Sequence, residues 1–271
     1  MKKYFKFTVV IVLIVFLIQI CVSTIKIQKK NKTIQVNSDV NASNTKIEWG
    51  IKREKDHKQP DLGKKNKELI EKYNGLAMGN KDSKKLYLTF DLGYEAGYTE
   101  KILDTLKENN VPAVFFITGH YLNTASDLVE RMISEGHIVG NHTVNHYSMP
   151  NLSNEQIKNE LMNLHTQVQN KFNYNMKYMR PPKGEYSESV LNEIRKLGYL
   201  PVMWSFAYAD WDEKKQPSHE EAINKIIENT HNGEIMLLHA TSKTNMEVLD
   251  NVIKQIKEMG YEFKSLDEFR K

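Results

Sequence analysis

Apolar residues from about residue 84 onward follow two patterns, which alternate along the chain. Short runs rich in Val, Ile, Leu, Phe, Tyr and Met predict strands, over Leu86–Phe90, Val111–Ile117, His137–Val139, Met176–Met179, Leu200–Trp204 and Glu234–Leu238. Amphipathic stretches between them predict helices, over Glu100–Asn109, Ala125–Glu135, Asn154–Lys171, Ser187–Leu197, His219–Thr230 and Asn245–Met259. This alternation indicates βαβ units and an α/β fold, with a mostly parallel sheet closed or nearly closed into a barrel.

The N-terminal part of the chain has a different pattern. Phe7–Ile25 is an uncharged apolar run, long enough to cross a bilayer as one helix, and three lysines precede it. No A-x-A-like site ends the run, and Ile20 is too bulky for lipoprotein processing at Cys21. We therefore expect a short cytoplasmic tip and a transmembrane signal anchor over residues 1–28, a flexible polar tether over 29–46, and one globular domain over 47–271.

Charge and cysteine content narrow the function. The 271 residues have a formal net charge of +4, which is too weak an excess to predict nucleic-acid binding. The single cysteine excludes an internal disulfide framework and a cysteine-based zinc site. A metal site in this chain would have to use His, Asp or Glu.

Polar side chains follow the predicted strands, at the edge where parallel α/β folds gather their functional groups. They are Asp91, His142, His146, Arg180, Asp210 and His239. Each has an ordinary interpretation when taken alone, as a turn former, a loop residue, a helix cap or a core histidine. Their joint occurrence at successive strand ends favours a shared catalytic site.

These residue types are suited to metal-assisted hydrolysis of an amide. The His-x-x-x-His spacing of His142 and His146 puts two imidazoles on one face, where they can hold a divalent ion such as zinc. Such an ion polarises a carbonyl and acidifies a bound water. Asp91 would then take the proton of the water as general base.

The remaining three side chains would support this chemistry. Arg180 would pair with Asp91 and keep that carboxylate ionised. His239 would donate a proton to the leaving amine, which is a poor leaving group without it. Asp210 would hold the His239 ring and favour its imidazolium form.

The segments around these residues resemble, in order, the five motifs of the polysaccharide deacetylases, the NodB homology enzymes of carbohydrate esterase family 4. The segments are Thr89–Tyr94, His142–His146, Arg180–Gly184, Asp210–Trp211 and Leu237–Ala240. The resemblance implies a distorted (β/α) barrel with fewer than eight strands. It also implies hydrolytic N-deacetylation of an amino-sugar polymer, with the catalytic and metal-binding roles assigned above.

Leu92 departs from the family pattern, in which this position is usually an Asp that gives the metal its third protein ligand. The resemblance therefore implies a weakly held divalent ion. Glu95 either contributes an oxygen to it or, as is more ordinary, serves as a carboxylate at a helix N-terminus. The subgroup with a replaced Asp and a Gly-Tyr-Glu continuation, as in Gly93–Glu95, is the peptidoglycan N-acetylmuramic acid deacetylases that form muramic δ-lactam in spore cortex. The likeness to this subgroup extends from about Ile47 to the C-terminus.

Substrate contacts are expected from three residues near these motifs. Lys183 would read the lactyl carboxylate of muramic acid, and Tyr208 and Trp211 would stack on sugar rings. Trp204 is another aromatic candidate, although its place within a strand favours core packing.

The expected protein is a single-pass membrane enzyme with its catalytic domain outside the cytoplasm, acting on peptide-free N-acetylmuramic acid in spore-cortex peptidoglycan. Two alternatives remain open. One is a deacetylase of N-acetylglucosamine in peptidoglycan or another glycan. The other is a barrel without catalysis that binds glycan strands or a partner enzyme. The sequence names no protein partner.

Overall fold

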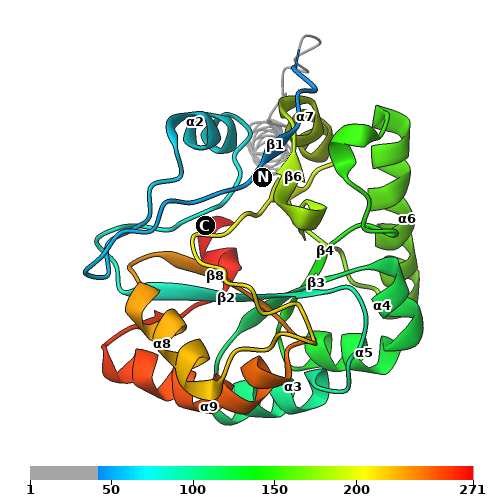
Figure 1. Cartoon of the computed structure of the whole chain (residues 1–271). Helices are drawn as coiled ribbons and strands as arrows, with labels where there is room; N and C mark the ends of the chain where they lie inside the picture. Colours follow the sequence, from blue (N-terminus) through cyan, green and yellow to red (C-terminus); the bar gives the residue numbers. More distant parts are fainter. Residues whose placement is uncertain (1–41, 271) are drawn as a thin grey trace, which may run out of the picture. The chain divides into compact units, whose positions relative to one another are not determined.

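The computed structural model describes residues 42–270, and a curled parallel sheet forms its centre (Figure 1). The strand order is β7-β5-β4-β3-β2-β8, and β9 pairs with the start of β2. The strands are β2 (Lys85–Leu92), β3 (Ala113–Ile117), β4 (Ile138–Asn141), β5 (Tyr178–Met179), β7 (Leu200–Pro201), β8 (Glu234–His239) and β9 (Glu262–Phe263). The prediction of a parallel α/β sheet with fewer than eight strands is confirmed for the described residues.

The sheet is an open half-barrel. The edge strands β7 and β8 are not paired as strands. The chain after β7 nevertheless runs across the opening, where Ser205 donates its backbone N–H to the Ile235 carbonyl at 3.0 Å and Phe206 accepts from Leu237 at 2.8 Å. The segment predicted as one strand to Trp204 therefore pairs with β5 at its start and reaches β8 just beyond its end.

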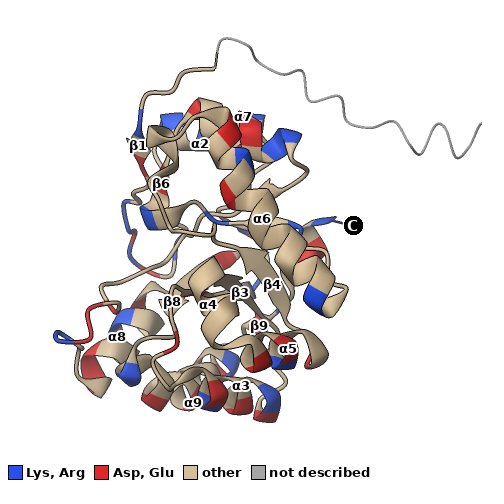
Figure 2. Cartoon of the chain, turned by 90° about the vertical axis from the view of Figure 1, so that its right-hand side faces the viewer, with Lys and Arg blue, Asp and Glu red and all other residues tan. Residues whose placement is uncertain are grey.

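Helices cover the outer face of the sheet (Figure 1). They are α3 (Thr99–Glu108), α4 (Gly119–Thr124), α5 (Ser126–Ser134), α6 (Asn154–Phe172), α7 (Glu188–Lys196), α8 (His219–Asn229) and α9 (Lys243–Glu258). Charged side chains lie mostly on these helices and on loops rather than on the strands (Figure 2). All six predicted helices are present, whereas α4 was not predicted.

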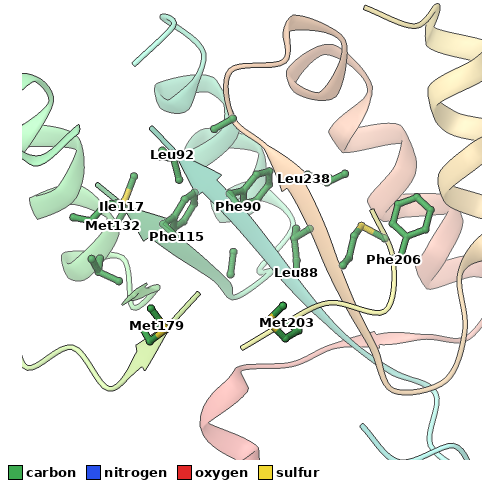
Figure 3. Packing of buried hydrophobic residues seen from close by; sticks show 14 of the residues in the cluster. Leu88, Phe90, Leu92, Phe115, Ile117, Met132, Met179, Met203, Phe206 and Leu238 are labelled. Atoms are coloured by element: carbon green, nitrogen blue, oxygen red, sulfur yellow. The ribbon is translucent and has the colours of Figure 1, made fainter. Parts of the chain in front are cut away.

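Side chains along β2 alternate between the hydrophobic core and the interior of the half-barrel, where the cleft lies. Leu88, Phe90 and Leu92 point outward and pack with Phe115 and other residues of the main hydrophobic core (Figure 3). The intervening positions point into the half-barrel, where Tyr87 belongs to a smaller apolar cluster. Because successive side chains of a strand point to opposite faces, Asp91 faces the interior and Leu92 faces the helices.

The segment before the barrel is ordered against the domain. Strand β1 (Ile47–Glu48) pairs antiparallel with β6 (Glu185–Tyr186), and helix α2 (Lys64–Lys72) follows. The backbone carbonyl of Ser43 accepts a hydrogen bond from Ser189 at 3.0 Å. Contacts with the domain thus begin inside the segment that the sequence assigned to a tether.

The expected transmembrane anchor lies outside the described residues, as does most of the expected tether. Within residues 42–270, none of the helices combines the length and the apolar character that crossing a bilayer requires.

Candidate active site

A cleft opens at the carboxyl ends of the strands, with a cavity volume of about 570 Å³. Its lining combines ionisable and aromatic side chains with two glycines: Asp91, Gly93, Tyr94, His142, His146, Lys183, Gly184, Trp204, Ala207, Tyr208, Trp211, Leu237, His239 and Thr241. Seven of the nine residues predicted as catalytic, metal-binding or substrate-binding line the cleft directly. The other two, Arg180 and Asp210, are buried and contact Asp91 and His239 respectively.

Asp91 is the central carboxylate of the cleft. It is the penultimate residue of β2, is 7% exposed, and accepts a hydrogen bond through Oδ1 from Arg180 at 2.7 Å. Burial would raise the pKa of Asp91, but the positive charge of Arg180 and the neighbouring imidazoles outweigh burial and lower it. Asp91 is therefore ionised at neutral pH, as a general base must be.

Arg180 is fully buried and fixed by several partners. Its guanidinium donates to the Thr89 hydroxyl at 2.9 Å and to the Met203 carbonyl at 3.2 Å. Its charge also lies 4.3 Å from the centre of the Phe116 ring. A Cβ at Gly140 would come within 2.5 Å of that ring, so this position must be glycine for Phe116 to support Arg180.

His142 and His146 lie side by side on the loop after β4, with ring centroids 4.9 Å apart. Nδ1 of His142 donates to the Arg180 carbonyl at 2.8 Å, which leaves Nε2 as the unprotonated nitrogen of the neutral ring. Burial lowers the pKa of both rings, that of His146 to about 4. Two neutral imidazoles with a free nitrogen are the form in which histidine binds a metal.

The geometry near His142 fits a divalent ion. Nε2 of His142 lies 3.5 Å from Oδ2 of Asp91, and no proton of a neutral His142 occupies the gap. Two ligands of a tetrahedral zinc ion at about 2.1 Å stand roughly 3.4 Å apart. Among residues 42–270, no cluster of three or more His, Cys, Asp or Glu side chains is arranged as a complete metal site. Leu92 is fully buried in the core and does not line the cleft.

Glu160 of α6 fixes the loop that carries His142 and His146. Its carboxylate accepts from the backbone N–H of Asn145 at 2.8 Å and from the Asn145 side chain at 2.6 Å. Sequence reasoning missed this residue. The available signal is a carboxylate within the buried stripe of α6, next to Leu161 and one turn from Ile157.

His239 ends β8 beside Asp91, and Asp210 orients its ring. Asp210 accepts from Nδ1 of His239 at 2.7 Å and from the His239 backbone N–H at 2.8 Å. Burial would lower the pKa of His239, but the charge of Asp210 and its hydrogen bond raise it above the usual value. His239 thereby has the properties of a proton donor, with Nε2 left free for the cleft.

Asn245 of α9 extends this pair into a network. Its side chain donates to Oδ2 of Asp210 at 2.6 Å, and its Oδ1 accepts from the Tyr208 hydroxyl. Asn245 is 1% exposed and was not predicted; a buried amide beside Val248 and Leu249 on α9 is the signal that could have found it.

The three predicted substrate contacts occupy different settings in the cleft. Trp211 is 58% exposed, and its ring lies 6.1 Å from that of His239. Lys183 is exposed on the loop after β5, with a left-handed φ of 60°. Tyr208 lines the wall but is largely buried, with its hydroxyl engaged by Asn245. A sugar could therefore contact the Tyr208 ring but not stack freely on both faces.

The loop that carries Lys183 is hydrogen-bonded to Trp49, which belongs to the segment before the barrel. The Trp49 backbone N–H donates to the Gly184 carbonyl at 2.9 Å, and the Trp49 indole donates to the Trp204 carbonyl at 2.9 Å. Gly184 has a φ of 67°, and a Cβ there would lie 2.7 Å from the Trp204 ring. Trp204 is thus both a packing residue and part of the cleft wall.

Glu95 accepts hydrogen bonds at the N-terminus of α3 and does not line the cleft. Its Oε1 accepts from the backbone N–H groups of Gly97 at 2.6 Å and Tyr98 at 2.9 Å, and its Oε2 accepts from the Tyr121 hydroxyl. The more ordinary of its two predicted roles, a carboxylate at the N-terminus of α3, matches these contacts.

Comparisons with known proteins agree with the motifs. The polysaccharide deacetylase family model matches residues 78–202. The chain is 43% identical over 226 residues to the peptidoglycan N-acetylmuramic acid deacetylase PdaA of Bacillus subtilis, covering 83% of this chain and 86% of PdaA. The solved structure of that family 4 carbohydrate esterase superposes with a TM-score of 0.82, covering 84% of this chain and 98% of the other. A peptidoglycan N-acetylglucosamine deacetylase of Bacillus cereus is 31% identical, over 73% of this chain and 72% of its own.

Proposed function

Because the chain belongs to the polysaccharide deacetylase family and is a hydrolase of amide bonds, we propose that it removes the acetyl group of peptide-free N-acetylmuramic acid in peptidoglycan. The observation that carries this proposal is that Asp91 and His239 lie side by side in the cleft, on the adjacent strands β2 and β8. The pKa of Asp91 is lowered and that of His239 is raised, each by a buried partner of opposite charge. The 43% identity to a muramic acid deacetylase supports the choice of sugar.

Four side chains of the site have distinct roles in that reaction. Asp91 removes a proton from the attacking water, and Arg180 keeps Asp91 ionised and fixed. His239 gives its Nε2 proton to the departing amine, so that the leaving group is neutral. Asp210 holds the imidazolium in place and stabilises its charge.

His142 and His146 are the residues that would hold a divalent ion, with Oδ2 of Asp91 beside them. When bound, the ion supplies Lewis acidity, which polarises the acetyl carbonyl and acidifies a water. With two imidazoles and no carboxylate from position 92, we expect weak binding that a chelator reverses.

Lys183 is the proposed reader of the lactyl carboxylate, which muramic acid carries and N-acetylglucosamine lacks. It lines the cleft beside His146, and its charge contributes to the lowered pKa of that ring. Lys183→Ala should then weaken action on muramic acid strands and spare neutral glycans. An equal loss on both substrates would end this assignment.

The cellular setting is part of the proposal. The subgroup that these motifs resemble acts on spore cortex, where the freed amine of muramic acid closes onto the lactyl carboxyl as a δ-lactam. The apolar run at residues 7–25 would anchor the enzyme in the membrane, with the domain on the side of the peptidoglycan.

The test is incubation of the full-length chain in detergent with peptide-free glycan strands and, separately, with chitin oligosaccharides, with and without divalent ions. Mass spectrometry should find loss of acetyl groups from muramic acid, followed by loss of water if the lactam closes. Loss from N-acetylglucosamine alone would favour that alternative. Strand binding without any acetate release would favour the barrel without catalysis.

A further inference from the structure

Three large hydrophobic side chains are exposed in the part of the chain that the structure describes: Tyr94, Tyr147 and Trp211, at 42%, 55% and 58%. All three lie on loops that follow or lead to strand ends around the cleft. Tyr94 and Trp211 line the cleft, whereas Tyr147 lies beyond it, directly after His146. Single exposed aromatics are common on protein surfaces, but a grouping around one cleft marks a binding surface.

The backbone on both sides of Tyr147 is fixed, while its ring is exposed to solvent. On one side, the His146 backbone N–H donates to the Thr143 hydroxyl at 3.0 Å, which fixes the residue before Tyr147. On the other side, Met149 is fully buried, and the Pro150 carbonyl accepts from Asn44 at 3.0 Å. A pinned backbone with an exposed ring costs little entropy when a ligand stacks on that ring.

Sheet order puts Tyr147 and Trp211 on opposite sides of Asp91. Tyr147 follows β4, and the ring of Trp211 lies beside that of His239, which ends β8, while β2 and β3 lie between these two strands. A ligand that runs from Trp211 past His239 and His146 leaves the cleft on the side of the loop that carries Tyr147. Tyr147 is not itself part of the cleft lining, so it would meet the part of the ligand that extends beyond the cleft.

We propose that Tyr147 forms a second sugar subsite, which binds an uncharged N-acetylglucosamine next to the reacting muramic acid. This inference rests on the proposed function and makes the enzyme specific for strands over single sugars. The two sugars alternate along a peptidoglycan strand, so the neighbour of each muramic acid lacks the lactyl carboxylate. An aromatic ring can pack against the apolar face of N-acetylglucosamine. Lys183 is instead suited to the negatively charged muramic acid.

The test compares Tyr147→Ala, Tyr147→Phe and the wild type on two substrates. One is a long peptide-free strand, and the other is the methyl glycoside of N-acetylmuramic acid. Tyr147→Ala should lower kcat/KM on strands about tenfold, mainly through KM, and Tyr147→Phe should stay near the wild type. On the single sugar, the ratio of wild type to Tyr147→Ala should approach one. Asn151→Ala, an exposed change on the same loop, is the matched control and should match the wild type on strands.

Two outcomes would overturn the subsite. An equal loss on strand and single sugar would mean that Tyr147 only positions His146, and no loss on strands would mean that no sugar stacks there. If the wild type releases no acetate from either substrate, the proposed function fails by itself. Calorimetric binding of strands to the same variants then decides the subsite, and equal affinities of wild type and Tyr147→Ala would refute it.

Discussion

Asp91 and His239 are register partners on the adjacent parallel strands β2 and β8. Their backbones are one strand spacing apart, about 4.8 Å, and both side chains face the half-barrel interior. Each also has a buried partner of opposite charge, Arg180 for Asp91 and Asp210 for His239. The sheet thus sets a carboxylate with a lowered pKa and an imidazole with a raised pKa at fixed separation.

Asp210→Asn should move the alkaline limb of the pH–rate profile to lower pH. Burial lowers the pKa of His239, and the Asp210 carboxylate reverses this by its charge and hydrogen bond. The acid form of His239 is lost as pH rises through its raised pKa, so the wild type should remain active above pH 6.5. With an amide at position 210 the raising charge is gone, and kcat should also fall by about 10². A limb at unchanged pH would contradict this role.

Asp91→Asn should remove the general base, and acetate release should drop on the order of 10³-fold. Asp91→Ala should cost about 3–5 kcal/mol of unfolding free energy, since it takes both the counter-charge and the hydrogen-bond acceptor from a buried guanidinium. Asp91→Asn also removes the charge but should cost less, because its amide oxygen can still accept from Arg180. Equal stability of the two variants would argue against the buried pair as described.

Asn245→Ala should lower kcat about tenfold with KM nearly unchanged, because Asn245 positions Asp210 and does not line the cleft. The alkaline limb of the pH–rate profile should also move to lower pH, an effect that a general loss of stability would not produce. Asn251→Ala, on an exposed position of the same helix, is the control and should retain wild-type rates. A proportionate loss of folded protein without a change in pH profile would rule out the positioning role.

Metal removal should abolish activity reversibly. A chelator should stop acetate release, and added zinc should restore it, since two imidazoles form a weak site. Calorimetry should detect zinc binding to the wild type, with His146→Ala weakened at least tenfold. Unchanged zinc affinity in that variant would place the ion elsewhere.

Glu234→Gln should stabilise the protein increasingly as pH rises. Glu234 is fully buried at the start of β8, and burial raises its pKa well above 4.5. A raised pKa means that the folded state holds its proton more tightly, so stability is lost as pH rises above about 4.5. The gain should be small at pH 5 and larger at pH 8, by about 1.4 kcal/mol for each pKa unit. Glu228→Gln, on the exposed face of α8, is the control, and a constant difference between pH 5 and 8 would refute the prediction.

The local pattern of apolar residues was sufficient to find the barrel elements, because the long helices bury one face that repeats along the chain, and the long strands are runs that are buried on both faces. The predicted run Leu86–Phe90 lies within β2, and Asn154–Lys171 within α6. Helices α2 and α4 and the pairing of β1 with β6 were missed. Helix α4 and the strands β1 and β6 are too short to carry a period, and contacts with distant segments stabilise them.

By itself, the sequence determined which chemical groups follow each strand, since motif residues are fixed by position in the chain. Only the tertiary structure decided how they meet. Arg180 reaches Asp91 across 89 positions, Leu92 turns to the helix core because strand side chains alternate, and Glu160 and Asn245 enter the site from helices. The reason is that hydrogen bonds between distant segments depend on strand order and register, which a pattern of apolar residues does not encode.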